Sequence, residues 1–489
     1  MTTHSHYING KWVEGSGERF ESTDPASGRT LWSGQTATPD EINRAVVAAR
    51  NAFETWSVTS MEHRADCLRA FRNRLLENIK PFAESLSRES GKPLWESGTE
   101  VTAMLSKVDL SIEAYQKRRR PETHHRSGGR TATRFKPHGV VAVLGPYNLP
   151  GHLSNAHVIP ALLAGNTLVY KPSEQTPLVA QKLSELWEST ELPPGAFNLV
   201  QGGRETGQRL ADHPIIDGLF FTGGYPAGLD IHRKFADHPE KILALELGGN
   251  NPLAIYQVSD LDAAAYWTIQ SAFITSGQRC TCARRLILPE GSDGNAVLDR
   301  FTTLTQTLRV GAYTSKPEPF MGPVISNASA DRLLAAQDEL LHQGGHGILP
   351  MRAIGGKRNM LSPGIIDVTG MNHRQDAELF GPLLQVIRVS DFDALVAEAN
   401  NTAYGLSAGL LSDDADLFDT FYRKVRAGII NWNRPTTGAS GALAFGGIGW
   451  SGNHRPSGFY ASDYCSYPVA SIEHDKLVFP DQITPGIEI

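Results

Sequence analysis

The chain has 489 residues, of which 40% are hydrophobic and 20% charged, and its formal net charge is −6. This length suffices for a large buried core and predicts two or more domains, and the composition is ordinary for a globular protein. The mildly acidic balance is spread along the chain and argues against a nucleic-acid binder.

The N-terminal residues 1–6 are polar and carry no basic-then-apolar targeting signal. No run approaches the roughly 20 apolar residues that a membrane span needs. The four cysteines are Cys67, Cys280, Cys282 and Cys465. They form no CxxC pair, and too few other potential metal ligands lie near them in the sequence for a zinc site. We therefore expect a cytoplasmic protein without disulfides or a metal.

The N-terminal part is predicted to be mostly helical after one hairpin. Asn9 and Gly10 favour a tight turn between two β-forming segments. Hydrophobic residues recur at helical spacing over residues 39–56, and further helices are expected over about 61–91 and 95–118. Residues 121–130 are expected to form a loop that leads into a short strand.

From residue 138 the pattern changes to short apolar strands separated by helices. The strands are expected at residues 140–144, 167–170, 197–200, 218–221 and 243–245, and the helices at 153–163, 177–190, 203–211 and 229–236. Such alternation predicts a parallel sheet with helices on both faces. Nucleotides bind beyond the carboxyl ends of the strands of such a sheet.

The second half repeats this alternation and predicts a second α/β domain. It begins with a strand over 253–256, a helix over 262–276 follows, and the alternation continues to about residue 433. Residues 469–473 resemble a strand that has no partner nearby in the sequence. Exposed strands need cover, so this segment either pairs with another subunit or packs as a tail.

Cys280 lies where the expected helix over 262–276 gives way to a strand. A cysteine attacks carbon only as its thiolate, so a reactive one needs a base, a cation or a helix N-terminus. A thiol in such a connection can face a cleft. The alternative is an inert core cysteine, since free cysteines are among the most buried residue types.

Two further polar residues stand alone in apolar surroundings. Glu246 interrupts an apolar run that ends at Gly248 and Gly249, so it is either a member of a structural ion pair or a general base tuned by desolvation. Asn148 follows an expected strand, where an amide either caps the next helix or donates to a developing oxyanion.

Five segments together resemble the aldehyde dehydrogenase superfamily. They are P-x-N-x-P at 146–150, F-T-G-G at 221–224, E-L-G-G at 246–249, G-Q-x-C at 277–280 and E-L-F-G-P at 378–382. Matches in motif order extend from Tyr7 to Glu473. The resemblance implies an α/β, aldehyde dehydrogenase-like fold with two Rossmann-like parallel-sheet domains and a small oligomerisation β element.

The resemblance also implies the chemistry and the residues that perform it. Cys280 would be the nucleophile, Glu246 the base for water, and Asn148 with the Cys280 N–H the oxyanion donors, in NAD-dependent oxidation of an aldehyde to an acid. The implied cofactor residues are Lys171, Glu174, Thr222, Gly223, Gly224, Tyr225, Pro226, Ala227, Gly228, Glu378 and Phe380. Glu174 would repel a 2′-phosphate and so favours NAD over NADP.

By the same resemblance we expect three structural units. Residues 1–120 and 138–255 would form the NAD-binding domain, residues 256–440 the catalytic domain, and residues 121–137 and 465–489 bridging strands of a homodimer or higher oligomer. Two positions depart from the family pattern: Gly449 stands where a lysine is usual, and Pro456 where many members place a glutamate that relays protons.

Several stretches resemble those of family members that oxidise a succinylated, dianionic semialdehyde in arginine breakdown. They are residues 147–152, 202–207, 247–252, 277–285 and 451–457. Arg279 and the loop 436–440, with Thr437 and Ser440, are expected to hold the substrate carboxylates; the alternative places Arg279 in a structural ion pair. Another acidic semialdehyde, thioester transfer to coenzyme A, and a noncatalytic scaffold of the same fold are the other readings.

Overall fold

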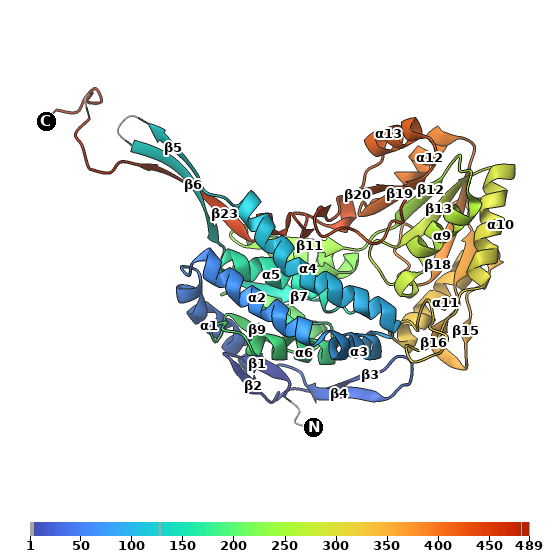
Figure 1. Cartoon of the computed structure of the whole chain (residues 1–489), viewed down its shortest axis with the longest axis horizontal. Helices are drawn as coiled ribbons and strands as arrows, with labels where there is room; N and C mark the ends of the chain where they lie inside the picture. Colours follow the sequence, from blue (N-terminus) through green and yellow to red (C-terminus); the bar gives the residue numbers. More distant parts are fainter. Residues whose placement is uncertain (1–3, 127–128, 481, 489) are drawn as a thin grey trace.

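The computed structural model describes residues 4–126, 129–480 and 482–488. The polar segment 1–6, the loop 121–130 and the C-terminal segment 465–489 therefore lie partly outside the described residues. Figure 1 shows two α/β lobes side by side and an arm of three strands that projects from the first lobe. Within the described residues, no helix is both long enough and apolar enough to cross a membrane.

The first lobe is built on a seven-stranded sheet. Its strands are β1 (His6–Ile8), β2 (Lys11–Val13), β7 (Val140–Leu144), β8 (Thr167–Lys171), β9 (Phe197–Leu199), β10 (Gly218–Gly223) and β11 (Ile242–Leu247). In the order β11-β10-β7-β8-β9-β1-β2, the first five run parallel. β1 and β2 form the predicted antiparallel hairpin at Asn9 and Gly10.

Helices cover both faces of this sheet because its strands bury side chains on both sides. On β7, Val141 and Val143 belong to one core cluster, and Val140 and Ala142 to the other. The helices are α1 (Pro39–Trp56), α2 (Met61–Glu77), α3 (Ile79–Ser90), α4 (Leu94–Arg118), α5 (His152–Ala164), α6 (Pro177–Glu188), α7 (Arg204–Ala211) and α8 (Tyr225–Phe235). α2 to α6 pack on the first face, and α1, α7 and α8 on the second.

The single helix predicted over 61–91 is wrong, since the structure has two. α2 and α3 meet at Asn78, whose φ of −116° and ψ of 21° leave the helical region. Pro81 explains the break. A proline lacks an N–H and clashes with the preceding turn, so it is tolerated only in the first turn of a helix, and α3 begins two residues before it.

The second lobe has its own seven-stranded sheet in the order β14-β17-β18-β13-β12-β19-β20, parallel except for β14. Its strands are β12 (Asn251–Ile255), β13 (Ala283–Pro289), β14 (His346–Leu349), β17 (Gly364–Asp367), β18 (Leu383–Val389), β19 (Ser407–Leu411) and β20 (Ile429–Trp432). Its helices are α9 (Leu261–Ala272), α10 (Ser292–Gln306), α11 (Asn327–His342), α12 (Phe392–Ala399) and α13 (Ala415–Lys424). The two parallel-sheet domains predicted from the alternation are confirmed.

One predicted domain limit needs correction. Residues 251–255 were assigned to the first domain, but β12 pairs with β13 and β19 in the second sheet. The two sheets therefore separate between β11 and β12, at Gly248 and Gly249. This places the Gly-Gly break two residues after Glu246, at the junction of the lobes.

The arm consists of β5 (Glu122–Arg126), β6 (Gly129–Pro137) and β23 (Ser466–Glu473). All eight residues of β23 pair with β6, so the C-terminal strand has its partner in the same chain. The residues around the expected loop 121–130 instead form β5 and the start of β6. β23 and β5 remain the two edges of this sheet, and the arm extends away from the body (Figure 1).

The remaining elements are short. They are the pairs β3 (Arg19–Thr23) with β4 (Thr30–Gln35), β15 (Ala353–Ile354) with β16 (Lys357–Leu361), and β21 (Ala444–Phe445) with β22 (Ser457–Gly458), the turns η1 (Ile274–Gly277) and η2 (Gly449–Ser451), and α14 (Ala461–Tyr464). Of these, η1 bears directly on the site, because it leads from α9 to Cys280.

Candidate active site

A cavity of about 810 Å³ collects residues that follow the carboxyl ends of β7, β8, β10 and β11. Asn148 enters it after β7, Lys171 and Glu174 at the end of β8, and Glu246 from β11. Cys280 enters the same cavity from the second lobe. The structure thus brings together the three predicted catalytic residues, at the sheet edge where ligands of such folds bind.

Cys280 is presented by a strained connection. The helix expected over 262–276 ends earlier, with α9 at Ala272, and η1 follows with Thr275 and Ser276 at φ of 55° and 54°. Burial and the neighbouring Glu246 carboxylate raise the pKa of the Cys280 thiol well above its usual value. The thiol is therefore protonated at neutral pH and needs a base before it can attack carbon.

Glu246 is placed to be that base. Its side chain is buried on β11, and burial raises its pKa to about 8, with the Glu378 carboxylate adding to the rise and the Cys280 thiol offsetting part of it. No described residue makes a regular hydrogen bond to either carboxyl oxygen. A carboxyl group with this pKa takes up and releases protons near neutral pH.

Asn148 is fixed beside the nucleophile segment. Its side-chain Nδ2 donates to the Gln278 backbone carbonyl oxygen at 2.9 Å. The backbone carbonyl oxygen of Asn148 accepts from the Lys92 Nζ at 3.0 Å. One N–H of the amide is used in that bond, which leaves the second for an oxygen bound at Cys280. The capping role considered for Asn148 is not seen, because no side-chain cap is formed at the start of α5.

Glu378 lies opposite the end of β11. Its Oε1 is 3.6 Å from the Arg284 guanidinium, and burial raises its pKa to about 6 against the lowering effects of Arg284 and the Gly249 N–H. A Cβ on Gly248 would overlap the Glu378 carboxyl group, so a glycine is needed there. The buried Arg284, whose guanidinium also lies 5.4 Å from the Phe380 ring, was not singled out from the sequence.

Lys171 is held at the end of β8 by backbone carbonyls. Its Nζ donates to the carbonyl oxygens of Pro172 at 2.6 Å and Gly202 at 2.7 Å, and lies 3.8 Å from the Glu174 carboxylate. Burial lowers the pKa of Lys171 to about 8. Glu174 is half-exposed at the cavity wall, so a carboxylate meets any hydroxyl or phosphate that enters next to Lys171.

The glycine-rich turn 222–227 forms another wall of the cavity. β10 ends at Gly223 and α8 begins at Tyr225, with Gly224 in extended conformation as the N-cap. The free N–H groups of a helix N-terminus suit a phosphate. Gly228 lies deeper, against Leu247, where a Cβ would overlap that side chain, so its role is close packing.

These walls fit a dinucleotide. A helix N-terminus faces the cavity, Lys171 and Glu174 stand at one part of the wall and Glu378 at another, and Cys280 with Glu246 lies in the same space. Tyr225, one of the expected cofactor residues, stacks on Trp450 with ring centroids 4.5 Å apart, and the pair closes a further side of the cavity; Trp450 was not singled out from the sequence. Scattered aromatics give no recognisable sequence signal.

The three expected substrate residues are not brought into this cavity. Arg279 pairs with Glu96 at 2.7 Å, Thr437 donates to the Gln270 carbonyl oxygen at 3.0 Å, and Ser440 is exposed. The structure thus shows the structural ion pair that was the alternative for Arg279.

Residues 12–468 match the sequence pattern of the family described as "Aldehyde dehydrogenase family". A curated relative from Chromobacterium violaceum, named N-succinylglutamate 5-semialdehyde dehydrogenase, is 51% identical over 99% of both chains. Among solved structures, a putative aldehyde dehydrogenase from Burkholderia cenocepacia superposes with a TM-score of 0.91 at 29% identity, covering 98% of this chain and 99% of that one. Betaine aldehyde dehydrogenase from Staphylococcus aureus in complex with NAD+ gives a TM-score of 0.92 at 25% identity, covering 98% and 97%.

Proposed function

The chain belongs to the aldehyde dehydrogenase family, and we propose that it oxidises N-succinyl-L-glutamate 5-semialdehyde to N-succinyl-L-glutamate with NAD in arginine breakdown. The observation that carries the chemistry is the pair Cys280 and Glu246, which shift each other's pKa in one cavity with Asn148. The substrate is inferred from the relative that shares 51% of its residues over nearly the whole length.

The first step forms a carbon–sulfur bond. The Glu246 carboxylate takes the thiol proton, and the Cys280 sulfur attacks the aldehyde carbon, whose oxygen becomes an oxyanion. The free N–H of the Asn148 amide and the Cys280 backbone N–H donate to that oxygen. Donors fixed in advance at the developing charge stabilise the transition state without reorganisation.

The second step is oxidation of the thiohemiacetal. Bound NAD supplies the electron acceptor for the hydride that leaves the former aldehyde carbon. The protein contributes the walls that hold such a dinucleotide: Lys171 and Glu174 for the adenosine ribose, the 222–227 turn for the pyrophosphate, and Glu378 with Phe380 at the nicotinamide ribose. The acyl group then remains on Cys280 as a thioester.

The last step releases the acid. Glu246, which has released the thiol proton to solvent and is again a carboxylate, removes a proton from a water molecule, whose oxygen attacks the thioester carbon. The carbon–sulfur bond breaks, and Cys280 leaves as a thiolate that takes up the proton from Glu246. Since Pro456 replaces the glutamate through which other members relay protons, Glu246 is the principal base in both steps. Its presence favours water over coenzyme A as acyl acceptor.

The preference for NAD rests on Glu174. Its carboxylate lies 3.8 Å from Lys171 at the cavity wall, so it accepts hydrogen bonds from ribose hydroxyls and repels a 2′-phosphate. Solved relatives of the same fold include one in complex with NAD+.

The dianionic substrate needs cationic or N–H groups outside the cofactor cavity. We assign Arg279 and the loop 436–440, with Thr437 and Ser440, to this task, with Arg279 fixed by Glu96. The Arg279→Ala substitution is expected to raise KM for the succinylated aldehyde more than KM for butanal. Equal KM changes for both aldehydes would leave Arg279 with its structural ion pair alone.

We further propose a cytoplasmic homodimer or higher oligomer. The arm supports this proposal, because β5 and β23 leave two sheet edges that project from the body. Open edges pair readily with a second chain. In this assignment the first lobe binds NAD and the second carries the nucleophile.

The function is tested by NADH absorbance with purified protein and NAD. N-succinylglutamate semialdehyde is compared with glutamate semialdehyde and with butanal. A strong preference in kcat/KM for the succinylated compound is expected. If the protein oxidises only the other aldehydes, the proposed substrate is wrong and the proposed mechanism stands. If neither NAD nor NADP is reduced with any aldehyde, the proposed function is refuted.

A further inference from the structure

Helix α4 carries two buried carboxylates on the face turned toward the active site. Glu96 and Glu100 are 0% and 3% exposed, and their spacing of four residues puts them one turn apart on the same face. In Figure 1, α4 runs along the body from the arm toward the second lobe. A buried carboxylate is costly unless it is paired, so the partners of these two groups indicate what they do.

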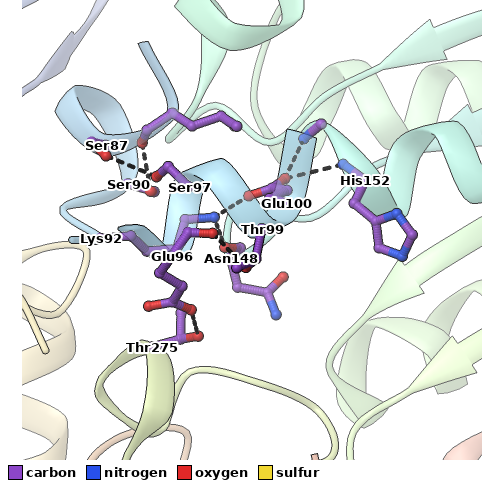
Figure 2. A network of polar contacts seen from close by, with 12 residues as sticks. Ser87, Ser90, Lys92, Glu96, Ser97, Thr99, Glu100, Asn148, His152 and Thr275 are labelled. Carbon is purple, nitrogen blue, oxygen red and sulfur yellow. Dashed lines mark hydrogen bonds and ion pairs between the residues drawn. The ribbon is translucent and has the colours of Figure 1, made fainter. Parts of the chain in front are cut away.

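Glu96 holds the segment that leads to the nucleophile. Its Oε1 accepts from the Arg279 Nη2 at 2.7 Å and from the Thr275 hydroxyl, and the Arg279 Nε donates to that hydroxyl at 2.7 Å. Figure 2 shows Thr275 reaching Glu96 from a neighbouring segment. Thr275 and Ser276 have positive φ, which is unfavourable for residues other than glycine and persists only where surrounding contacts impose it.

Glu100 holds the segment that carries the oxyanion amide. Its Oε1 accepts from the Gly151 N–H at 2.9 Å and the His152 N–H at 3.0 Å. Its Oε2 pairs with the buried Lys92, whose Nζ donates to the backbone carbonyl oxygen of Asn148 at 3.0 Å. Residues 148–152 are thus held at both ends by one carboxylate and its lysine (Figure 2).

We propose that Glu96 and Glu100 are positioning residues that fix the Cys280 sulfur relative to the Asn148 amide. The two segments come from different lobes, and one rigid helix holds both. Four residues of helix separate the two points of attachment by about 6 Å. This inference rests on the proposed function, because it takes Cys280 and Asn148 as the groups that act on the aldehyde. A misplacement of about 1 Å in such a pair lowers the rate on the order of 100-fold.

The Glu96 half is tested with Glu96→Ala and Glu96→Gln. A Gln amide oxygen can accept the same two hydrogen bonds, so kcat is expected to fall at least ten-fold in the Ala variant and less than three-fold in the Gln variant. The matched control is Glu113→Gln, an exposed carboxylate on α4 that pairs with Lys117. Cofactor affinity should stay within two-fold of the wild-type value in all three.

A second readout needs no aldehyde. The rate at which iodoacetamide alkylates Cys280, followed by mass spectrometry, is expected to change at least three-fold in Glu96→Ala and to stay within two-fold in Glu96→Gln. If the Glu96→Ala variant is alkylated at the wild-type rate, or if the Glu96→Gln rate is changed as much as the Glu96→Ala rate, Glu96 does not position the segment. Wild-type protein inert toward all aldehydes would instead refute the proposed function, and the alkylation rates would still decide on Glu96.

The Glu100 half is tested by combining variants. If Glu100 acts through Asn148, Glu100→Ala lowers kcat at least ten-fold alone and less than two-fold in an Asn148→Ala background. Multiplicative effects of Glu100→Ala and Asn148→Ala would overturn the proposal. If Glu100→Ala does not fold because Lys92 loses its partner, the neutral double variant Lys92→Met, Glu100→Gln is used in its place. Its effect on kcat is likewise expected to be lost in the Asn148→Ala background.

Discussion

The Asn148 side chain donates a 2.9 Å hydrogen bond to the carbonyl oxygen of Gln278, two residues before Cys280. Asn148 follows β7 of the first sheet, whereas Gln278 follows α9 of the second lobe. The bond therefore joins the two lobes at the point where the proposed reaction takes place. It also fixes the orientation of the amide, whose remaining N–H lies at the cavity that Cys280 lines.

This geometry predicts the effect of removing the amide. Asn148→Ala should lower kcat/KM by about 10²- to 10³-fold, the usual cost of one oxyanion donor. Steady-state NADH formation measures the loss, and cofactor affinity measured by fluorescence serves as the control. An Asn148→Ala enzyme with wild-type kcat/KM would exclude Asn148 as an oxyanion donor.

Substitution of the base should slow both chemical steps, and the hydrolysis of the thioester most. In Glu246→Gln, hydrolysis of the thioester loses its general base, and turnover should fall by about 10²- to 10⁴-fold. Rapid mixing is expected to show incomplete or slowed NADH formation in the first turnover, since Glu246 also accepts the thiol proton. Unchanged steady-state turnover would assign the base to another residue.

The pH dependence follows from the same residue. Burial raises the pKa of Glu246 to about 8, and only its carboxylate form accepts a proton. Turnover should therefore rise with pH until about pH 8 and fall roughly ten-fold per unit below it. Glu378→Gln removes a neighbouring negative charge and should shift the midpoint downward. A rate that stays flat from about pH 6 to pH 9 would contradict this assignment.

Cofactor choice is predicted to depend on one carboxylate. Glu174→Gln removes the repulsion of a 2′-phosphate but keeps a hydrogen-bond acceptor beside Lys171. The ratio of kcat/KM for NADP to that for NAD should rise at least about ten-fold, which corresponds to about 1.4 kcal/mol. If the ratio is the same in both proteins, Glu174 does not discriminate between the cofactors.

A glycine substitution tests the position of Glu378. In Gly248→Ala the new methyl group would overlap the Glu378 carboxyl group, which must then move. NAD affinity is expected to weaken by about ten-fold, or about 1.4 kcal/mol. Gly203→Ala is the matched control, because a Cβ there meets no neighbour within 4 Å and φ is −86°. Equal affinities in the two variants would argue against Glu378 as a cofactor residue.

Local patterns predicted the elements that depend on local contacts. Residues 39–56 form α1 at both predicted limits, with the capping box of Thr38 and Glu41 at its start. The hairpin at Asn9 and Gly10 and the alternation of strands and helices are also confirmed. Periodicity missed the break at Asn78, because the hydrophobic spacing continues across it and only Pro81 indicates an end.

The pairing of strands that lie far apart in the chain could not be predicted from the sequence. A short buried strand such as residues 251–255 does not reveal which sheet it joins, and the partner of β23 lies far away in the sequence, in β6. At the site, motif residues could be named, but Glu96 and Glu100 resemble ordinary helix-surface charges, and Lys92 an ordinary charge between two helices, until α4 is packed against the cavity. Their burial is a tertiary property.

The most direct test of the account is the covalent intermediate on Cys280. Glu246→Gln protein is mixed with NAD and N-succinylglutamate semialdehyde, quenched in acid and digested for mass spectrometry. We predict one N-succinylglutamyl acyl group on the Cys280 peptide, absent when NAD is omitted and absent in Cys280→Ser. An acyl group on another residue, or turnover retained in Cys280→Ser, would contradict the account.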